Sequence, residues 1–376
     1  MKKLRTFDVF SGIGGMSRAL SDICCTVAYC EIQAGCRDVL LCNIRKGLLK
    51  DAPIFHDIRL VTGSMLPHNI QMITAGFPCQ DLSSAGNQLG MKGSRTSLFH
   101  HIVRLAAEMP SVSVIFMENS SLILKNGIDV VVSSLIKLGF KISYTCIQAN
   151  EVGAPHRRRR WYAVATRNCN ALPRLVSRAK HNWDQQPAPL MRKSADQQGR
   201  PWIPNAMYER YSMIGNAIVP QCAALAWNEL TKVREVSASY ENPVITALDV
   251  VTHIDKSCKK TCERNVIFTA KPLQIVISTA NGVSKRSLWA TPTSTPGRNK
   301  QYRTLNGPRA LNNLFNQLFY AQHIQEKYNK SKAVLASELS KFYYLNPVWL
   351  EWLMGYPSNW TRIDTKCACI APSLLK

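Results

Sequence analysis

Short motifs in the first half of the chain carry residue types that suit nucleophilic catalysis. Cys79 lies in the run Gly76–Gln80, directly after an apolar strand, which predicts a thiol at the edge of a sheet. The thiolate is the reactive form, and a free cysteine has a pKa of about 8.5, so positive neighbours or desolvation must help it. Glu118 and Asn119 end a second apolar strand. These residues predict a nucleophile beside a candidate acid.

An arginine-rich run, His156–Arg160, leads into a third apolar strand. Side chains alternate along a strand, so Arg158 and Arg160 are expected on the same face. Taken alone, the run is more simply a solvated loop. Because Cys79 and Glu118 also follow apolar strands, we expect the arginines to belong to the same site as these two residues.

A second group of residues suits the binding of an adenosine. The run Phe10–Gly15 ends the first strand and opens a helix, where glycines let the backbone approach a ligand closely. The spacing is not that of a dinucleotide fingerprint, because the third glycine follows the second at once. Glu31, after the second strand, can accept hydrogen bonds from a ribose diol, and Asp57, after the short strand Ile54–Phe55, can contact an adenine amino group. Two ordinary loop acids are the alternative.

The elements that must position these motifs alternate between apolar runs and helical patterns over residues 4–165. This alternation predicts a doubly wound, mostly parallel sheet with helices on its faces, the α/β Rossmann-like class. The predicted strands are Leu4–Phe10, Thr26–Glu31, Met72–Ala75, Ser113–Met117, Ser143–Gln148 and Arg160–Ala165. Helical spacing is found in Gly15–Ser21, Gln33–Arg45, Leu98–Glu108 and Asp129–Leu138.

The second half of the chain is harder to divide. Residues 166–212 form a basic, irregular segment, and an ordered element over 213–229 is expected to return to the catalytic domain of residues 1–165. Residues 230–376 are predicted to form a smaller, basic lobe for target recognition or structural support. It contains strand-like runs and helical spacing over Leu311–Phe342.

The composition favours a polyanionic partner. The chain of 376 residues has 47 Lys and Arg against 24 Asp and Glu, a formal net charge of +23, while its hydrophobic content of 46% is ordinary for a globular protein. The 13 cysteines are unpaired in spacing, which favours a reducing, intracellular compartment. The pairs Cys258/Cys262 and Cys367/Cys369 lack the second pair that a zinc site needs, so no metal is expected. No apolar stretch approaches the ~20 residues of a membrane span.

In order and spacing, five motifs resemble those of the DNA (cytosine-5) methyltransferase family. They are the Phe-x-Gly-x-Gly-Gly run from Phe10, Pro78-Cys79-Gln80, Glu118-Asn119, His156-x-Arg158-x-Arg160 and Gly215-Asn216-Ala217 followed by Pro220. The resemblance implies the class I fold of enzymes that use S-adenosylmethionine, and double-stranded DNA as the partner. A cognate restriction nuclease acting separately is a further possible partner.

The resemblance also implies a mechanism and a role for each residue. Cys79 adds to carbon 6 of a flipped-out cytosine, Glu118 protonates or hydrogen-bonds ring nitrogen 3, and carbon 5 takes the methyl group. Asn119 is expected to position the Cys79 loop, and Arg158 and Arg160 to hold the base or its phosphate. The implied cofactor-binding residues are Phe10, Gly12, Gly14, Gly15, Glu31, Ile32, Asp57, Ile58, Pro78, Leu98 and Asn216. The glycine-rich segment Asp81–Phe99 is a candidate mobile loop over the base.

Three departures from the family pattern stand out. Gln71 replaces an acid before the strand that leads to Cys79, which we expect to alter hydrogen bonding on the cofactor side. His156 replaces a glutamine and should be tolerated, because both side chains donate hydrogen bonds. Residues 345–360 resemble motifs that normally precede the Gly-Asn-Ala motif, so the order is exchanged, as in phage and large DNA viruses. Sequence readout is then shared between 166–212 and Leu288–Lys341.

Other functions remain open at this stage. An RNA methyltransferase acting on tRNA shares the same cysteine and carboxyl chemistry. A non-catalytic DNA-binding relative would keep the fold, but it has no need of Cys79, Glu118, Arg158 and Arg160 together. A nicotinamide dehydrogenase is disfavoured by the glycine spacing.

Overall fold

The computed structural model describes most of the first 231 residues and a short segment near the C-terminus. The described residues are 3–78, 98–125, 127–167, 172–175, 181–195, 201–202, 205–231, 276–279, 282–285 and 343–363. Cys79, residues 81–97 of the predicted mobile loop and the predicted readout region 288–341 lie outside them.

A seven-stranded sheet forms the centre of the molecule. Its strands are β1 (Leu4–Val9), β2 (Cys24–Cys30), β3 (Ile54–Phe55), β4 (Met72–Gly76), β5 (Val114–Ser120), β6 (Lys141–Gln148) and β7 (Arg159–Thr166). They lie in the order β3-β2-β1-β4-β5-β7-β6. In this sheet β7 runs in the opposite direction to the other six strands, so its pairings with β5 and β6 are antiparallel and the remaining pairings are parallel. The predicted doubly wound, mostly parallel sheet is confirmed.

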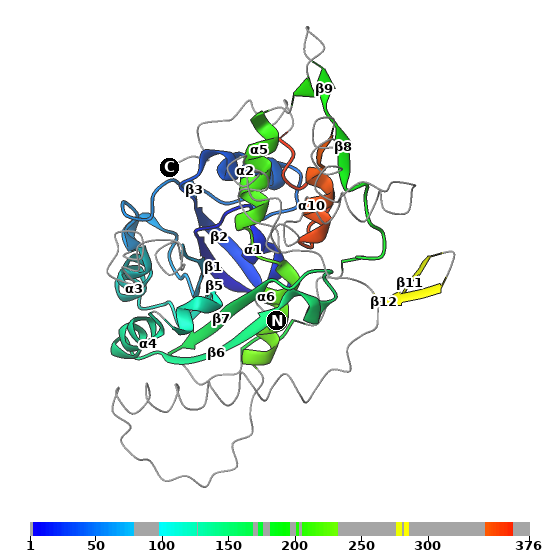
Figure 1. Ribbon diagram of the computed structural model, residues 1–376. Coiled ribbons are helices and arrows are strands. Elements are labelled where there is room, and N and C mark those ends of the chain that lie inside the picture. The colour runs from blue at the N-terminus through cyan, green and yellow to red at the C-terminus, as the bar shows by residue number, and fades with distance from the viewer. Residues whose placement is uncertain are drawn as a thin grey trace.

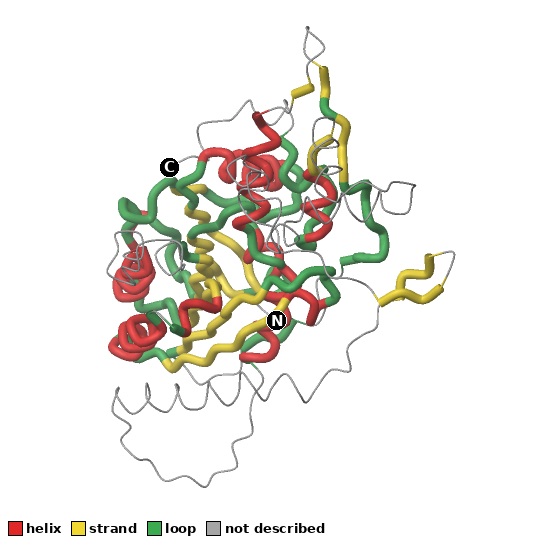
Figure 2. Tube along the Cα trace, in the orientation of Figure 1, coloured by secondary structure: helices red, strands yellow, loops and turns green. Residues whose placement is uncertain are grey.

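Helices cover both faces of this sheet (Figure 1 and Figure 2). On one face, α3 (Leu98–Glu108) and α4 (Ile128–Lys137) pack in a buried cluster with side chains of the central strands. The opposite face is covered by α1 (Gly15–Ala19), α2 (Ala34–Arg45), α5 (Asn205–Asn216), α6 (Pro220–Leu230) and α10 (Pro347–Leu353). Both faces of the sheet are buried, which suits the apolar runs Met72–Ile73 in β4 and Val114–Met117 in β5; the buried Asp8 in the central strand β1 is an exception.

The remaining elements are short. The 3-10 turns within the described residues are η1 (Gly63–Met65), η4 (Ser121–Leu124) and η5 (Ala149–Val152). Paired short strands are β8 (Leu190–Arg192) with β13 (Tyr343–Leu345), β9 (Ser194–Ala195) with β10 (Pro201–Trp202), and β11 (Val276–Thr279) with β12 (Gly282–Lys285). None of the helices in the described ranges is long and apolar enough to cross a membrane.

Two element boundaries differ from the sequence prediction for identifiable reasons. β1 ends at Val9 because Phe10 has a positive φ of 54°, which ends the extended backbone. The predicted single element 213–229 is two helices, α5 and α6. The residue before a proline is pushed out of the helical region, and Val219 before Pro220 is extended, with φ −92° and ψ 110°. The Gly-Asn-Ala motif therefore spans the end of α5 and the turn after it.

Residues 343–363 return to the core of the sheet domain. β13 pairs with β8 in antiparallel register, and the Asn346 side chain caps α10 by accepting from the backbone N–H of Val348 at 3.0 Å. Two indole hydrogen bonds connect α10 to residues 182–183. The indole N–H of Trp183 donates to the carbonyl of Trp352, and the indole N–H of Trp352 donates to the carbonyl of Asn182, both at 3.1 Å. This far end of the chain shares one buried cluster with α1 and α6.

Candidate active site

The first loop, from Phe10 to Gly15, follows β1 at the carboxyl edge of the sheet. Phe10, Gly12 and Gly14 have φ of 54°, 52° and 84°, so the loop winds through the left-handed region three times. A Cβ built on Gly12 would meet nothing within 4 Å. Gly12 therefore offers the open backbone surface that a bound ligand requires.

The other two glycines of the loop are closed in by the protein itself. A Cβ on Gly14 would lie 2.7 Å from Cδ1 of Leu49, and one on Gly15 would overlap the Tyr356 hydroxyl and Ile218. These positions need glycine for packing, whereas the sequence predicted that all three line the cofactor.

Glu31 follows β2 beside this loop and is 9% exposed. Its two carboxylate oxygens accept the backbone N–H groups of Gly12 and Gln33, both at 2.8 Å. Burial raises the pKa of Glu31, and these two hydrogen bonds oppose the rise. Each oxygen keeps a further lone pair, so the carboxylate is fixed in place and can still accept from a diol. Ile32, next in the chain, is 65% exposed beside it.

Asp57 lies on the same edge, after β3, but its carboxylate has a partner of its own. Nε of Arg59 donates to both oxygens at 2.9 Å, and this pairing lowers the pKa of Asp57. The predicted adenine contact would share the carboxylate with Arg59. Among the other predicted cofactor residues, Ile58 is buried, Pro78 and Leu98 are half-buried, and Asn216 is exposed at the end of α5.

Glu118 lies on the neighbouring part of the edge, near the end of β5. It pairs in register with Gly76 of β4, and its Oε2 is the nearest atom to a Cβ built there, at 3.6 Å. Its other oxygen, Oε1, lies 3.2 Å from Nε of Arg160. Burial raises the pKa of Glu118, while Arg160 and Arg158 oppose the rise. The carboxyl group thus faces the strand that leads to Cys79.

Asn119 ties β5 to the same strand end. Its buried Nδ2 donates to the carbonyl of Phe77 at 3.3 Å, and its Oδ1 accepts the N–H of Ser120 at 2.7 Å. Phe77 lies two residues before Cys79. The contact is the kind that a residue positioning the Cys79 segment would make.

Arg158 and Arg160 both interact with Glu118, but their guanidinium groups have different partners. Arg158 is buried and donates to the carbonyls of Gly215 and Ala217, at 3.1 and 2.9 Å. Burial lowers its pKa to about 10. Arg158 therefore holds the turn at Asn216, a role that the sequence did not predict, and Arg160 is the arginine that contacts the carboxyl group.

Two of the departures noted in the sequence, His156 and Gln71, lie within the described residues, and their contacts can be compared with the expectations. Nε2 of His156 lies 3.1 Å from the carbonyl of Leu353, and Nδ1 accepts the N–H of Arg158 at 3.3 Å. Burial and Arg158 lower its pKa to about 3, so the ring is neutral and Nε2–H donates, as expected of a glutamine substitute. The expectation for Gln71 was wrong. Its Oε1 accepts the N–H of Arg5 at 3.2 Å, at the amino ends of the strands and away from the site.

Asp8 is a buried acid that sequence reasoning missed. Its carboxyl oxygens accept the hydroxyls of Ser17 at 2.6 Å and Thr74 at 2.8 Å, and the Ser11 hydroxyl donates to its backbone carbonyl at 2.6 Å. Burial raises the pKa of Asp8 to about 6. An acid inside the apolar run 7–9 was the available signal, because a charge in a strand buried on both faces needs polar partners.

Across the described part of the chain, no group of three or more His, Cys, Asp and Glu side chains is arranged to hold a metal ion.

A family model and several curated proteins match this chain, and the family model covers its first half. The family model of the C-5 cytosine-specific DNA methylases matches residues 4–200. Type II methyltransferase M.CviJI of Paramecium bursaria Chlorella virus IL3A is 30% identical over 60% of this chain and 59% of its own length. M.HhaI of Haemophilus parahaemolyticus is 31% identical over 44% and 50% of the two chains.

The matches leave part of each relative uncovered. M.MspI of Moraxella sp is 31% identical over 43% of this chain and 38% of its own length, so the chain spans about half the length of the curated relatives it matches. Among solved structures, that of the Dnmt2 methyltransferase of S. pombe has a TM-score of 0.38 at 20% identity, over 49% of this chain and 63% of that one.

Proposed function

The chain belongs to the family of C-5 cytosine-specific DNA methylases, and from that premise we propose that it methylates carbon 5 of cytosine in DNA, with S-adenosylmethionine as donor. The observation that carries the proposal is the placement of Glu118. Its carboxyl group is buried, lies against Arg160, and faces the strand that leads to Cys79. The Phe10–Gly15 loop, which we assign to the adenosine, lies at the same edge of the sheet and follows β1, two strands from β5.

The residues divide the chemistry between them. The Cys79 thiolate adds to carbon 6 of the base while Glu118 gives a proton or hydrogen bond to ring nitrogen 3, which makes carbon 5 nucleophilic. S-adenosylmethionine would supply an electrophilic methyl group to that carbon and be released as S-adenosylhomocysteine. Loss of the carbon 5 proton to solvent then expels the Cys79 thiolate, and return of the nitrogen 3 proton to Glu118 restores the ring. The raised pKa of Glu118 supports its role as a proton carrier.

The residues on the cofactor side suit the adenosine moiety of such a donor. Gly12 leaves open space over the loop, Glu31 has acceptor capacity for the ribose hydroxyls, and the exposed Ile32 offers an apolar surface to the adenine ring. Asn216 lies in the turn that Arg158 holds. The predicted set Phe10, Gly12, Gly14, Gly15, Glu31, Ile32, Asp57, Ile58, Pro78, Leu98 and Asn216 is retained, with Gly14 and Gly15 acting through the shape of the loop.

Double-stranded DNA is the substrate in this proposal, and the net charge of +23 supports it. The base must leave the duplex to reach a buried carboxyl group, and flipping costs a few kcal/mol, which phosphate contacts offset. In this proposal, residues 1–165 and 213–229 form the catalytic body, 166–212 take part in target recognition, and 230–376 serve target recognition or structural support. Side chains of 343–363 belong to the same buried cluster as the body. Reaction on DNA places the protein inside a cell, where a cognate nuclease is a possible functional partner.

The test is transfer of tritium from labelled S-adenosylmethionine to duplex DNA and, separately, to total tRNA. We expect label in DNA, at carbon 5 of cytosine by bisulfite sequencing. Label only in tRNA would contradict the proposal, and no transfer to either would favour a non-catalytic relative.

The nucleophile is tested by Cys79→Ser. Transfer should fall by at least about a thousandfold, as for loss of other catalytic nucleophiles, while DNA binding persists. Cys25→Ser is the matched control, since Cys25 is half-buried at the opposite end of the sheet and should keep full activity. Equal activity of the two variants would contradict the assignment.

A further inference from the structure

The far end of the chain touches the loop that carries Gly12. The indole N–H of Trp360 donates to the carbonyl of Ile13 at 2.8 Å. The Tyr356 hydroxyl lies against Gly15 and donates to the carbonyl of Ile218 at 3.0 Å. Trp360 and Ile13 are 347 residues apart in the sequence, and Tyr356 and Ile218 are 138 residues apart, yet all four belong to one buried cluster.

The loop needs such support because its backbone is unfavourable by itself. Positive φ costs free energy, most of all at Phe10, which is not a glycine. β2 holds the first half of the loop, through the N–H of Ser11 to the carbonyl of Cys30 at 3.0 Å and the N–H of Gly12 to Glu31. The second half of the loop receives a hydrogen bond from outside the loop, from the indole N–H of Trp360 to the carbonyl of Ile13.

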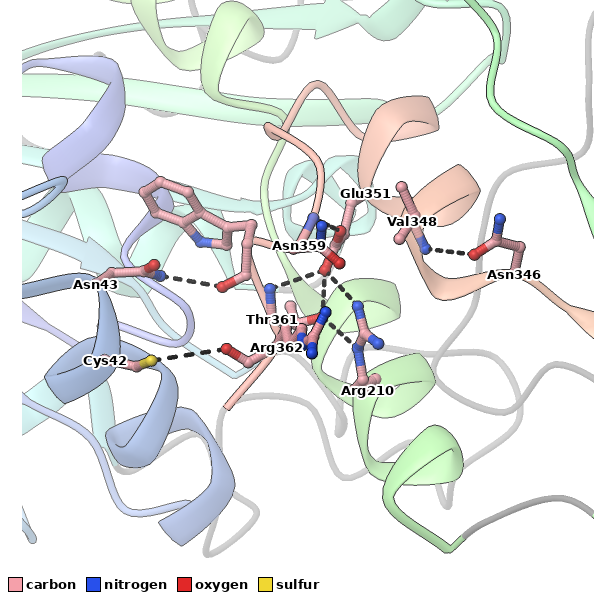
Figure 3. Close-up of polar contacts among 10 residues, drawn as sticks. Cys42, Asn43, Arg210, Asn346, Val348, Glu351, Asn359, Thr361 and Arg362 are labelled. Atoms are coloured by element: carbon pink, nitrogen blue, oxygen red, sulfur yellow. Dashed lines mark hydrogen bonds and ion pairs between the residues drawn. The ribbon is translucent and has the colours of Figure 1, made fainter. Parts of the chain in front are cut away.

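Trp360 is itself held from both sides. Its carbonyl accepts Nδ2 of Asn43 in α2 at 3.1 Å, and the guanidinium of Arg18 lies 5.0 Å over its ring. Figure 3 shows Asn43 and Cys42 of α2 reaching towards this segment, with Glu351 and Arg210 on its other side. The indole is 1% exposed and has little freedom to turn away from Ile13.

A buried carboxylate fixes the turn that carries Trp360. Glu351 of α10 is fully buried and accepts the backbone N–H groups of Asn359 at 2.6 Å and Thr361 at 2.8 Å, on either side of Trp360 (Figure 3). Nη2 of Arg210 in α5 completes the set at 2.9 Å. Because the charge is paired and hydrogen-bonded, the turn is rigid and anchored to both α10 and α5.

We propose that Trp360 and Tyr356 are positioning residues for S-adenosylmethionine, which hold the Phe10–Gly15 loop in its ligand-binding conformation. The inference rests on the proposed function, since it assigns that donor to the loop. Neither side chain needs to touch the ligand. If the loop adopts this conformation only part of the time, the apparent affinity falls in proportion.

Trp360→Phe tests this directly, because it removes one N–H group and little volume. In the full-length protein, the Kd for S-adenosylhomocysteine by calorimetry and the KM for S-adenosylmethionine should both rise about tenfold, which corresponds to about 1.4 kcal/mol. The value of kcat and the KM for DNA should change less than about threefold, because the base side is untouched.

Trp352→Phe is the matched control. Trp352 is 5% exposed, lies in the same segment, and also donates its indole N–H to a backbone carbonyl, that of Asn182 at 3.1 Å, away from the loop. Both variants should lose similar thermal stability, but only Trp360→Phe should weaken ligand binding. Equal affinities in the two variants would overturn the inference.

Tyr356→Phe keeps the inference testable if Trp360→Phe does not fold. It removes only the hydroxyl that holds Ile218 and lies against Gly15, and a rise of about threefold in the same Kd is expected. Unchanged affinity would contradict the inference. Absence of binding by the wild-type protein would instead overturn the proposed function itself, so the two failures are distinguishable.

Discussion

Glu31 and Glu118 lie at the same edge of one sheet and are equally buried, yet their surroundings differ. They are 9% and 8% exposed, and burial raises the pKa of both. Glu31 accepts two backbone N–H groups, those of Gly12 and Gln33. Glu118 has a guanidinium, that of Arg160, on one oxygen and faces Gly76 with the other.

In the proposed function, this difference separates a carboxylate that binds the cofactor from one that reacts. Backbone N–H groups cannot move away or lose a proton, so they fix Glu31 as a permanent acceptor. A carboxyl group with one oxygen turned towards the reacting strand can exchange a proton with a base. In this proposal, the contacts of Glu31 keep the cofactor side of the edge in one fixed geometry, whereas those of Glu118 allow the charge on the base side to change.

The largest effect expected from this comparison is that of Glu118→Gln. The amide keeps the size of the side chain but cannot transfer a proton to ring nitrogen 3. We expect kcat to fall by about 10²- to 10⁴-fold, with the Kd for S-adenosylhomocysteine within twofold of the wild-type value. A variant with wild-type kcat would remove the distinction between the two carboxyl groups.

Asp8 gives the next largest effect, on stability rather than on rate. The pKa of the Asp8 carboxyl group is about 6 in the folded state and 3.8 in the unfolded state. Because the folded state binds this proton more tightly, protonation of Asp8 stabilises the fold fully below pH 3.8, and this contribution to the free energy of unfolding is lost as the pH rises through about 6. The free energy of unfolding of the wild type, relative to Asp8→Asn, should therefore fall by about 2 kcal/mol between pH 4 and pH 7. Parallel pH profiles in urea titrations would show that Asp8 does not titrate there.

The smallest of the three effects is that of Glu31→Gln. A neutral amide accepts more weakly and from one oxygen only, so the KM for S-adenosylmethionine should rise about tenfold. kcat should stay near the wild-type value, because the base side is unchanged. Initial rates over a range of both substrates separate the two parameters, and a loss in kcat without a change in KM would reverse the roles of the two halves.

Local patterns predicted much of the fold. The helix Leu98–Glu108 has the predicted bounds, because its apolar residues recur at the spacing of one buried face. The sheet edge that gathers Glu31, Asp57 and Glu118 also followed from sequence, since parallel strands end on the same side.

Contacts between distant segments were beyond such patterns. Nothing in the sequence near Arg158 shows that its partners are the carbonyls of Gly215 and Ala217. The pairing of Trp360 with Ile13 likewise depends on how layers pack, not on spacing. The expectation for Gln71 failed for another reason: a residue directly before β4 lies at the amino end of that strand, opposite the cofactor edge, and there its side chain meets Arg5.

The pairing of β13 with β8 has a consequence for how such a chain can change over time. Trp227, close to the end of α6, and Tyr344 in β13 belong to one buried cluster, so the chain between them is fixed at both ends to the same domain. For a chain fixed at both ends, doubling its length costs only about 0.6 kcal/mol of closure entropy. Recombination can therefore exchange or lengthen that stretch at little cost to the stability of the sheet domain, so under the proposed function the recognised DNA sequence could change while the catalytic residues stay the same.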